Sequence, residues 1–269
     1  MMSKAGLQYL DSVQLFFFQI LSAAVLVWLV LLIQRKKLLL NKGALKAYAT
    51  GILEPFLAYV LTLYGLEYVS SGIASIIFSL ESIFTLLFSV IFLKMKINTI
   101  GIFILLLFGT MIGSLMAVLL DIGLGSNKIY GYFFILAGVL FAAVYVLISS
   151  KLVESFDPIV LLTGQLTFCL LLTVILLFFT GNNIAFPGKG KVLIFLSGVF
   201  QYFLAFILYL YSLKWIKVYI AGVMLYFIPI TALILSYLFL EENISSMQIT
   251  GIGMVIICVF LLNKKYEYK

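Results

Sequence analysis

A carboxylate inside a long apolar run is the residue of this sequence best placed to do chemistry. The run covers residues 71–93, and Glu81 is its only charged residue. A run of this length can cross a bilayer, where a bare carboxylate is costly and usually faces a cavity or a partner. The functional interpretation is that Glu81 binds a proton or a cationic substrate. The structural alternative is a protonated carboxyl bonded to a neighbouring helix.

A second acidic residue, Glu54, lies about two helical turns into the apolar run 47–66. It belongs to a stripe of small and polar residues at helical spacing, Ala47, Thr50, Gly51, Glu54, Ala58, Thr62 and Gly65. Such a stripe is typical of close helix packing or of a cavity wall, and packing is the commoner explanation. Pro55 and Pro229 each remove a backbone hydrogen bond, so they predict kinks that either serve gating or only shape the packing.

Glutamines and tyrosines are the other candidates for a polar path. Gln19, Gln165 and Gln201 all lie within apolar runs. The candidate aromatic liners are Tyr59, Tyr145, Tyr202 and Tyr226. Each tyrosine could equally serve ordinary packing or the aromatic belt at the membrane interface.

The composition excludes most enzyme classes. The 269 residues are 65% hydrophobic and 10% charged, with a mean hydropathy of +1.26, whereas a soluble domain carries about a quarter charged residues. The sequence has no His, which excludes His-ligated metal sites and His general bases. It also has no nucleotide-binding loop, zinc-protease motif or nucleophile elbow. We therefore expect a polytopic membrane protein that is not an enzyme and needs no metal or cofactor.

Apolar runs and basic residues together predict the topology. Nine runs are long enough to span a bilayer: 12–33, 47–66, 71–93, 99–120, 131–149, 158–179, 191–210, 219–240 and 246–262. Thirteen of the seventeen lysines and arginines fall on one side of this arrangement: Arg35, Lys36, Lys37, Lys42, Lys46, Lys94, Lys96, Lys151, Lys214, Lys217, Lys264, Lys265 and Lys269. The positive-inside rule then places the C-terminus in the cytoplasm and the N-terminus outside the cell membrane. The net charge of +7 is mostly this topology signal, so no nucleic-acid partner is expected.

The chain also repeats itself. A shift of 147 residues lays 51–97 on 198–244 without a gap, and 16 of the 47 positions are identical. Charges at the matched ends invert, since Lys94 falls opposite Glu241. The copies should therefore sit upside-down relative to each other, an arrangement typical of secondary transporters with the substrate site between the copies. Gln201 is the counterpart of Glu54, and Gln165 follows Gln19 at an interval of 146 residues.

The two copies are unequal. The second begins with the run 131–149, whose counterpart would lie just upstream of Met1. A ten-helix parent without its first helix explains this. The predicted fold is an all-α integral membrane protein with nine transmembrane helices, from an inverted 5+5 helix repeat with the first helix missing. We expect a first repeat of four helices at 1–120 and a second of five at 121–269.

Three segments of the second half resemble the drug/metabolite transporter superfamily, EamA type. Residues 208–214 (LYLYSLK) resemble the family's aromatic–x–x–Ala–Leu–Lys ending of the third helix. Residues 226–230 (YFIPI) resemble its mid-helix proline, and 238–242 (LFLEE) followed by Gly251 resemble its Leu–x–x–Glu … Gly hairpin. In the first half, Glu81 and Ser82 stand where the family usually has a proline. The resemblance covers essentially the whole chain and implies export or uptake of small metabolites by alternating access, without ATP.

The leading hypothesis is a secondary active transporter of small organic metabolites, whether amino-acid-like, amphipathic or cationic, with proton coupling through Glu81 as an option. A flippase for lipid-linked sugars or phospholipids, of the same superfamily, is the alternative, and its mark would be a lipid-open groove with basic residues near its mouth. A membrane-embedded transferase is a third hypothesis and ranks lower. The fourth is that the chain has lost its function together with the missing first helix. The expected partners are a small-molecule substrate and the lipid bilayer, and a homodimer stays open.

Overall fold

A computed structural model describes residues 2–93, 129–181, 190–216 and 227–240, with the single residues 188, 218, 221, 224, 225, 250 and 253. Every element in these ranges is a helix. The elements are α1 (Met2–Gly6), α2 (Ser12–Ile33), α3 (Lys42–Tyr48), η1 (Ala49–Ile52), η2 (Leu53–Leu57), α4 (Ala58–Tyr68), α5 (Ser71–Phe78), α6 (Leu80–Leu93), α8 (Ile129–Ser155), α9 (Pro158–Thr180), α10 (Lys191–Gly198), η3 (Val199–Leu204), α11 (Ala205–Trp215) and α13 (Phe227–Leu240).

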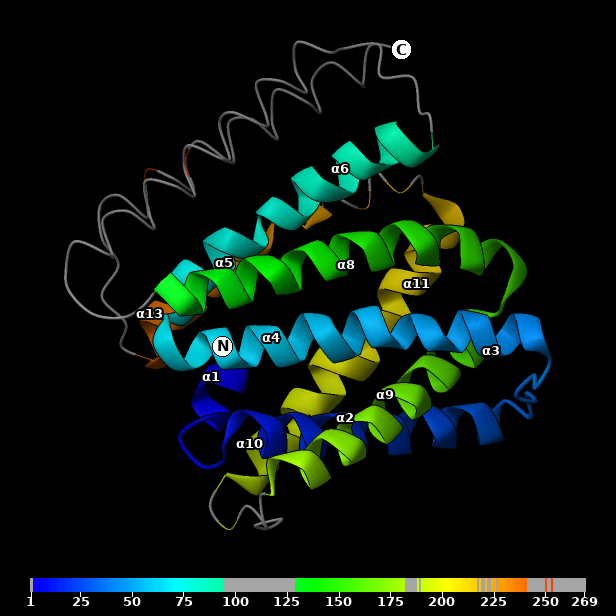
Figure 1. The fold of residues 1–269 in the computed structure, drawn as a ribbon, viewed down its shortest axis with the longest axis horizontal. Coiled ribbons are helices and arrows are strands. Elements are labelled where there is room, and N and C mark those ends of the chain that lie inside the picture. Colours follow the sequence, from blue (N-terminus) through cyan, green and yellow to red (C-terminus); the bar gives the residue numbers. More distant parts are fainter. Residues whose placement is uncertain are drawn as a thin grey trace.

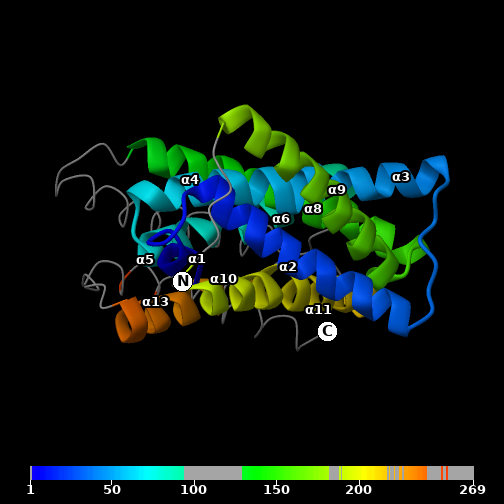
Figure 2. The same ribbon diagram turned by 90° about the horizontal axis from the view of Figure 1, so that it is seen from below.

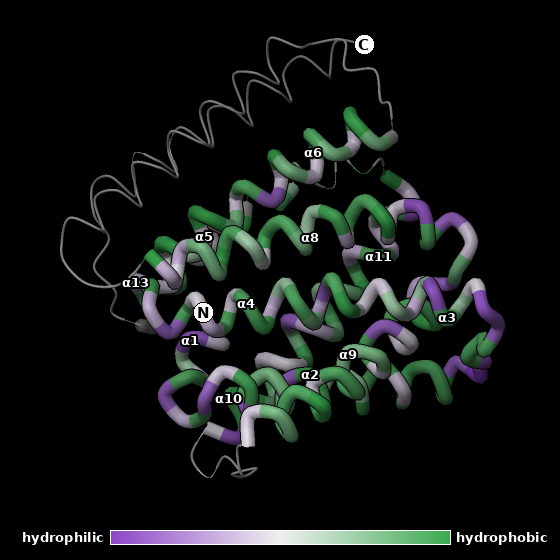
Figure 3. Tube along the Cα trace, viewed as in Figure 1, coloured by the Kyte–Doolittle hydropathy of each residue, from purple (hydrophilic) through white to green (hydrophobic). Residues whose placement is uncertain are grey.

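Six helices of the described ranges are long and apolar enough to cross a membrane. They cover Ser12–Ile33, Lys42–Tyr68, Ser71–Phe92, Ile129–Ser155, Pro158–Thr180 and Lys191–Trp215. Each coincides with one of the predicted apolar runs, and polar residues gather mainly at the helix ends and connections (Figure 3). Of the other predicted runs, 99–120 and nearly all of 246–262 lie outside the described residues, and 219–240 is described mainly as α13.

The helices form layers around a central pair. Helices α4 and α8 lie side by side, with α2, α9 and α10 on one side and α5 and α6 on the other (Figure 1). Seen at 90° to this view, α3 and α4 form one line along the molecule, α10 and α11 form a second, and α2 runs obliquely between them (Figure 2). The core includes Phe16, Tyr145 and Tyr202, each at most 1% exposed.

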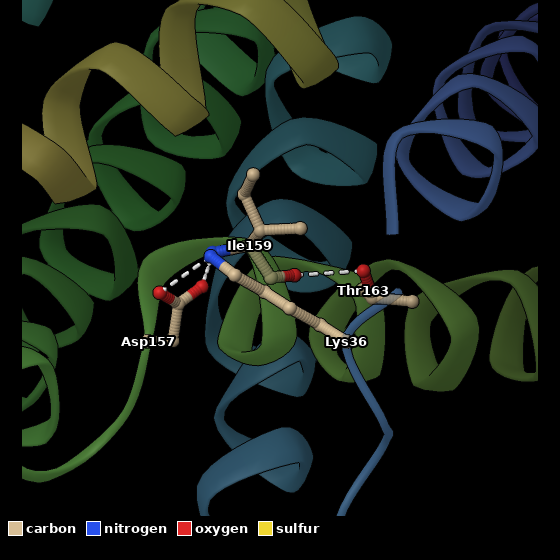
Figure 4. A network of polar contacts seen from close by, with 4 residues as sticks. All are labelled: Lys36, Asp157, Ile159 and Thr163. Atoms are coloured by element: carbon tan, nitrogen blue, oxygen red, sulfur yellow. Dashed lines mark hydrogen bonds and ion pairs between the residues drawn. The ribbon is translucent and has the colours of Figure 1, made fainter. Parts of the chain in front are cut away.

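Two helices from different halves of the chain, α2 and α9, are capped at their N-termini, and an ion pair links α9 to the segment after α2. Asp11 and Asp157 stand at the N-caps of α2 and α9, where each side chain accepts backbone N–H bonds, which satisfies groups that the helix start leaves open. The Lys36 Nζ atom also donates to Asp157 Oδ2 at 2.7 Å (Figure 4). Burial raises the pKa of Asp157, but the bonds from Lys36 and from the Ile159 N–H outweigh it and leave the pKa below its usual value.

The helix over Lys42–Tyr68 is interrupted at Glu54. The backbone there is extended, with φ −147° and ψ 127°, and Pro55 follows, which has no N–H to donate. The segment η2 around this point is a π-helix. The segment η3 in the second half is also a π-helix, without a proline. Such segments disturb the regular backbone ladder and are frequent at functional sites.

The predicted run 71–93 forms one membrane-length helix, Ser71–Phe92, with a local irregularity at Ser79, whose backbone stays helical at φ −60° and ψ −22°. Ser79 Oγ donates to the Ile76 carbonyl at 2.6 Å, and its N–H lies within bonding distance of two carbonyls, those of Ser75 and Ile76. A serine side chain that bonds the local backbone competes with the helical ladder. Glu81 lies just after this irregularity, in the first turn of α6.

Element bounds recur at the spacing of the sequence repeat. Helices α4 and α11 both contain 11 residues, and they begin at Ala58 and Ala205. Each follows a π-helix and ends in an extended residue, Val69 or Ile216. The local backbone of the two halves therefore follows the same plan.

A cavity with two carboxylates

A polar cavity of about 250 Å³ lies between helices from both halves of the chain. Three predicted site residues, Glu54, Glu81 and Gln201, line it. The other lining residues are Ser3, Ala58, Tyr59, Thr62, Leu66, Ser71, Ala74, Ser75, Phe78, Ala142 and Ile228. Helices α1, α5 and α13, which contribute to this lining, gather near the same end of α4 and α8 (Figure 1). Its volume is at the small end for ligand pockets, so it suits a small metabolite.

The two carboxylates line this cavity from irregular points of their helices. Glu54 lies at the interruption in η2, and Glu81 lies in the first turn of α6, just after the irregularity at Ser79. Each is 8% exposed, and Glu81 acts electrostatically on Glu54. Within the described ranges, neither carboxylate forms an ion pair with a lysine or arginine. Two negative charges repel each other strongly where water is scarce, so the pair favours states in which a proton or a cation neutralises one carboxylate.

A hydrogen-bonded chain leads from the cavity wall into the core. Tyr59 and Gln201 both line the cavity, and Ser3 Oγ donates to Gln201 Oε1 at 2.8 Å. Gln19 Nε2 in turn lies within bonding distance of Ser3 Oγ, at 3.1 Å, and of Ser197 Oγ, at 2.7 Å. Gln19 is fully buried. The predicted residue Gln19 therefore supports the cavity wall from behind, through Ser3, rather than lining it.

Gln165 occupies the corresponding place on α9. Its Nε2 atom donates to Thr50 Oγ1 at 2.8 Å, and its Oε1 atom accepts from the Tyr145 hydroxyl at 3.0 Å. Gln165 is fully buried and is absent from the described lining of the cavity. Its described contacts are those of a residue that joins α9 to η1 and α8.

The two glutamine contacts are reciprocal between the halves. Gln19 of the first half bonds Ser197 of the second, and Gln165 of the second half bonds Thr50 of the first. Thr50 and Ser197 are separated by the repeat interval of 147 residues. Each half therefore contacts the other through a glutamine amide and a hydroxyl at matching positions of the sequence repeat.

Glycines next to these hydroxyl residues let the helices approach closely. A Cβ atom at Gly51 would lie 2.5 Å from the Gln165 carbonyl oxygen. At Gly198, which is 147 residues later, a Cβ atom would collide with the Gln19 carbonyl and with the Ser22 side chain. A residue without a side chain is therefore needed at both crossings, as in other tightly packed membrane helices.

An aromatic cluster adjoins the cavity. The ring centroids of Tyr59 and Tyr202 are 4.7 Å apart in an edge-on arrangement, and Phe206 stacks on Tyr202 with centroids 6.4 Å apart. The Tyr202 hydroxyl is buried without a hydrogen-bond partner in the described part of the structure. Of the predicted aromatic liners, Tyr59 faces the cavity, whereas Tyr145 and Tyr202 lie in the packing around it.

Two predicted residues lie wholly or partly outside the described residues, and several contacts were not predicted from the sequence. Tyr226 lies outside the described residues, and Pro229 is the third residue of α13, with a side chain that also lies outside them. The contacts of Ser3, the bond of Thr50 to Gln165 and the bond of Ser197 to Gln19 were not predicted. The sequence contained a signal for Thr50 and Ser197, because each stands immediately before a glycine that the repeat alignment matches.

Comparisons with known proteins agree with this architecture. The family model described as the EamA-like transporter family matches residues 1–119 and 129–264. An uncharacterized transporter of Archaeoglobus fulgidus is 26% identical over 226 residues, which cover 82% of this chain and 78% of that protein. One of Clostridium kluyveri is 29% identical over 234 residues, covering 84% and 74%. A solved crystal structure has the same fold, with a TM-score of 0.74 at 14% identity, over 96% of this chain and 89% of that one.

Apolar helices that surround a small polar cavity define a multi-pass membrane protein of the transporter class. The chain belongs to the EamA-like transporter family, within the drug/metabolite transporter superfamily, as its sequence motifs predicted.

Proposed function

We propose that this protein is a secondary active transporter that moves a small organic solute across the cytoplasmic membrane by alternating access. Glu54 and Glu81 form its proton- and cation-binding pair. The observation that carries the proposal is that both carboxylates line one small cavity together with their repeat counterparts, Gln201 and Ile228. A site shared by equivalent positions of two repeats is what alternating access around a central site requires.

The lining favours a solute with an amino group. A carboxylate binds an ammonium group through charge-assisted hydrogen bonds, while the Gln201 and Tyr59 side chains supply neutral polar contacts. Phe78 adds an apolar surface. An amino-acid-like or amine solute satisfies all three features. Arrival of its cationic group would displace the proton that neutralises the pair, and this exchange couples solute movement to a pH gradient.

The fold behind this mechanism is an inverted repeat of nine transmembrane helices with the C-terminus in the cytoplasm. Support comes from the matched bounds of α4 and α11, the paired π-helices and the reciprocal glutamine contacts. The two stretches matched by the family model fit a division into residues 1–120 and 121–269. Bending at η2 and η3 would let the halves open the cavity to either side in turn, since such irregular segments are natural hinge points.

The structure also bears on the flippase alternative. A second hollow, the α2–α10 groove, is lined by Phe18, Leu21, Ser22 and Val25 of α2 and by Lys191, Val192, Ile194, Phe195 and Leu196 of α10. Among the described residues, this groove shares no lining residue with the carboxylate cavity. A lipid in the groove is therefore separate from the proposed transport site, which favours a soluble solute as the cargo.

The test is transport in proteoliposomes that contain the purified chain, with and without a pH gradient, using a panel of amino acids, amines and neutral metabolites. We expect the pH gradient to drive uptake of an amine-bearing solute by the wild type. Glu81→Gln should lose this pH dependence, and Glu81→Asp should keep part of it. Glu154→Gln is the matched control, because Glu154 is an exposed carboxylate paired with Lys151 at the surface. Unchanged pH-driven uptake in both Glu81→Gln and Glu54→Gln would refute the role of the pair.

A further inference from the structure

The α2–α10 groove has the shape and surface of a lipid site. Its volume is about 470 Å³. Apart from Ser22 and Lys191, its described lining is apolar, and Val25, Val192 and Phe195 are each about half exposed or more. Both helices belong to spans that cross the membrane, so the exposed residues of the groove meet hydrocarbon. An apolar groove in that position is accessible to lipid chains.

One end of the groove carries positive charge. Lys191 is the first residue of α10, and it is exposed. Neither ion pair found among the described residues involves Lys191. Gly190 stands at the N-cap of α10 without a side-chain cap, so the first-turn N–H groups have no side-chain acceptor there. A helix start attracts anions, and a lysine beside it adds a full charge.

The hydrogen-bond donors behind the groove are used within the protein, and the Gln19 Oε1 atom, which has no partner among the described residues, is buried away from the groove surface. Ser22 Oγ donates to the Gln19 carbonyl at 2.8 Å, and Gln19 Nε2 donates to Ser197 Oγ. The floor of the groove therefore offers little to a polar ligand, while the Lys191 end offers a cationic contact. The cationic end of the groove matches the anionic head of a phospholipid, and its apolar body matches an acyl chain.

We infer that the groove binds one anionic phospholipid from the bilayer, with its phosphate at Lys191 and the α10 N-terminus and an acyl chain between α2 and α10. The lipid contacts both halves of the chain at the interface of α2 and α10. On the inner side of the same interface, Gln19 bonds Ser197. Its binding stabilises the arrangement in which α2 and α10 are packed together. The lipid is a bound ligand at the membrane-facing surface and does not pass through the carboxylate cavity.

The test measures lipid retention by native mass spectrometry of the full chain in detergent, with phosphatidylglycerol and phosphatidylcholine of identical acyl chains as probes. We expect one phosphatidylglycerol to be retained in preference to phosphatidylcholine. Lys191→Gln should weaken this preference by up to about fivefold, the effect of losing one exposed ion pair. Lys46→Gln is the control, since Lys46 is an exposed lysine on α3, outside the groove.

A second variant tests the apolar part of the site. Val192→Trp fills the groove from an exposed position, so it should reduce retention of both lipids without loss of folding. Addition of inorganic phosphate should leave retention unchanged, because the acyl chain supplies the groove contacts. Equal retention of the two lipids, wild-type retention by Lys191→Gln, or the same loss in Lys46→Gln would each overturn the inference.

Discussion

The close crossing of η1 and α9 at Gly51 makes a quantitative prediction about stability. Gly51→Ala would place a Cβ atom 2.5 Å from the Gln165 carbonyl oxygen, whereas ordinary contacts begin at 3.4 Å. Helix α9 must therefore move away from η1 by about 0.9 Å. The same shift would stretch the bond of 2.8 Å from Gln165 to Thr50 beyond hydrogen-bonding distance.

The expected cost follows from these changes. Overpacking of a tight contact costs about 1–3 kcal/mol, and loss of the hydrogen bond adds about 1 kcal/mol. Replacement of a helical glycine by alanine returns roughly 0.5–1 kcal/mol. The net loss of unfolding free energy is about 1–3 kcal/mol, which corresponds to a fall in melting temperature of roughly 3–10 °C. Gly198→Ala should behave alike, because it meets the Gln19 backbone in the equivalent crossing.

The assay is thermal unfolding of the purified protein in detergent, with Gly43→Ala as the matched control. A Cβ atom at Gly43 has 3.4 Å of clearance from the Asn41 side chain, so this variant should be as stable as the wild type or slightly more. If Gly51→Ala melts at the same temperature as Gly43→Ala, α9 and η1 do not approach as described. The bond from Gln165 to Thr50 would then not join the two halves as described.

Two further predictions concern the polar edges of the molecule. The lowered pKa of Asp157 means that its bond with Lys36 stabilises the fold above the ordinary pKa of 3.8 and is lost as the pH falls through the folded-state pKa. Lys36→Met should therefore lower the melting temperature at neutral pH and flatten its decline towards about pH 3, and an unchanged profile would rule out the pair as a stabilising contact. For the topology, single cysteines at Ser126 and Asn183 should react with an impermeant reagent from outside, and one at Lys42 only after permeabilisation. The reverse pattern would refute the assigned orientation.

Hydropathy was enough to predict the helices but not their interruptions or neighbours. Runs such as 12–33 and 158–179 were recovered because length and apolar content alone decide whether a segment can span a bilayer. The interruption at Glu54, where the backbone is extended, and the irregularity at Ser79, where a hydroxyl bonds the Ile76 carbonyl, are local backbone features that hydropathy does not register. Lateral packing is equally invisible to hydropathy, since lipid and a neighbouring helix are both apolar surroundings.

The candidate site was partly predictable because the repeat supplied spatial information. Glu54 and Gln201 were matched by the repeat, and both line the cavity. Gln165 was also matched, to Gln19, but it lies behind the cavity wall because Thr50 and Tyr145 hold both ends of its amide. The position of a residue within its apolar run does not distinguish a side chain that faces a cavity from one that joins two helices.

The central claim is that the carboxylate cavity is reached by solute from both sides of the membrane. Ser75→Cys places a nearly isosteric thiol in the cavity lining, and Ser79→Cys places one about a turn further along, fully buried and outside the described lining. In a background with Cys169 and Cys258 replaced, labelling is measured with a small impermeant methanethiosulfonate in vesicles of either orientation. The account predicts that Ser75→Cys reacts from both sides, that the transported solute slows this reaction, and that Ser79→Cys stays unreactive. Labelling of Ser75→Cys from one side only, or at a rate unaffected by the solute, would contradict it.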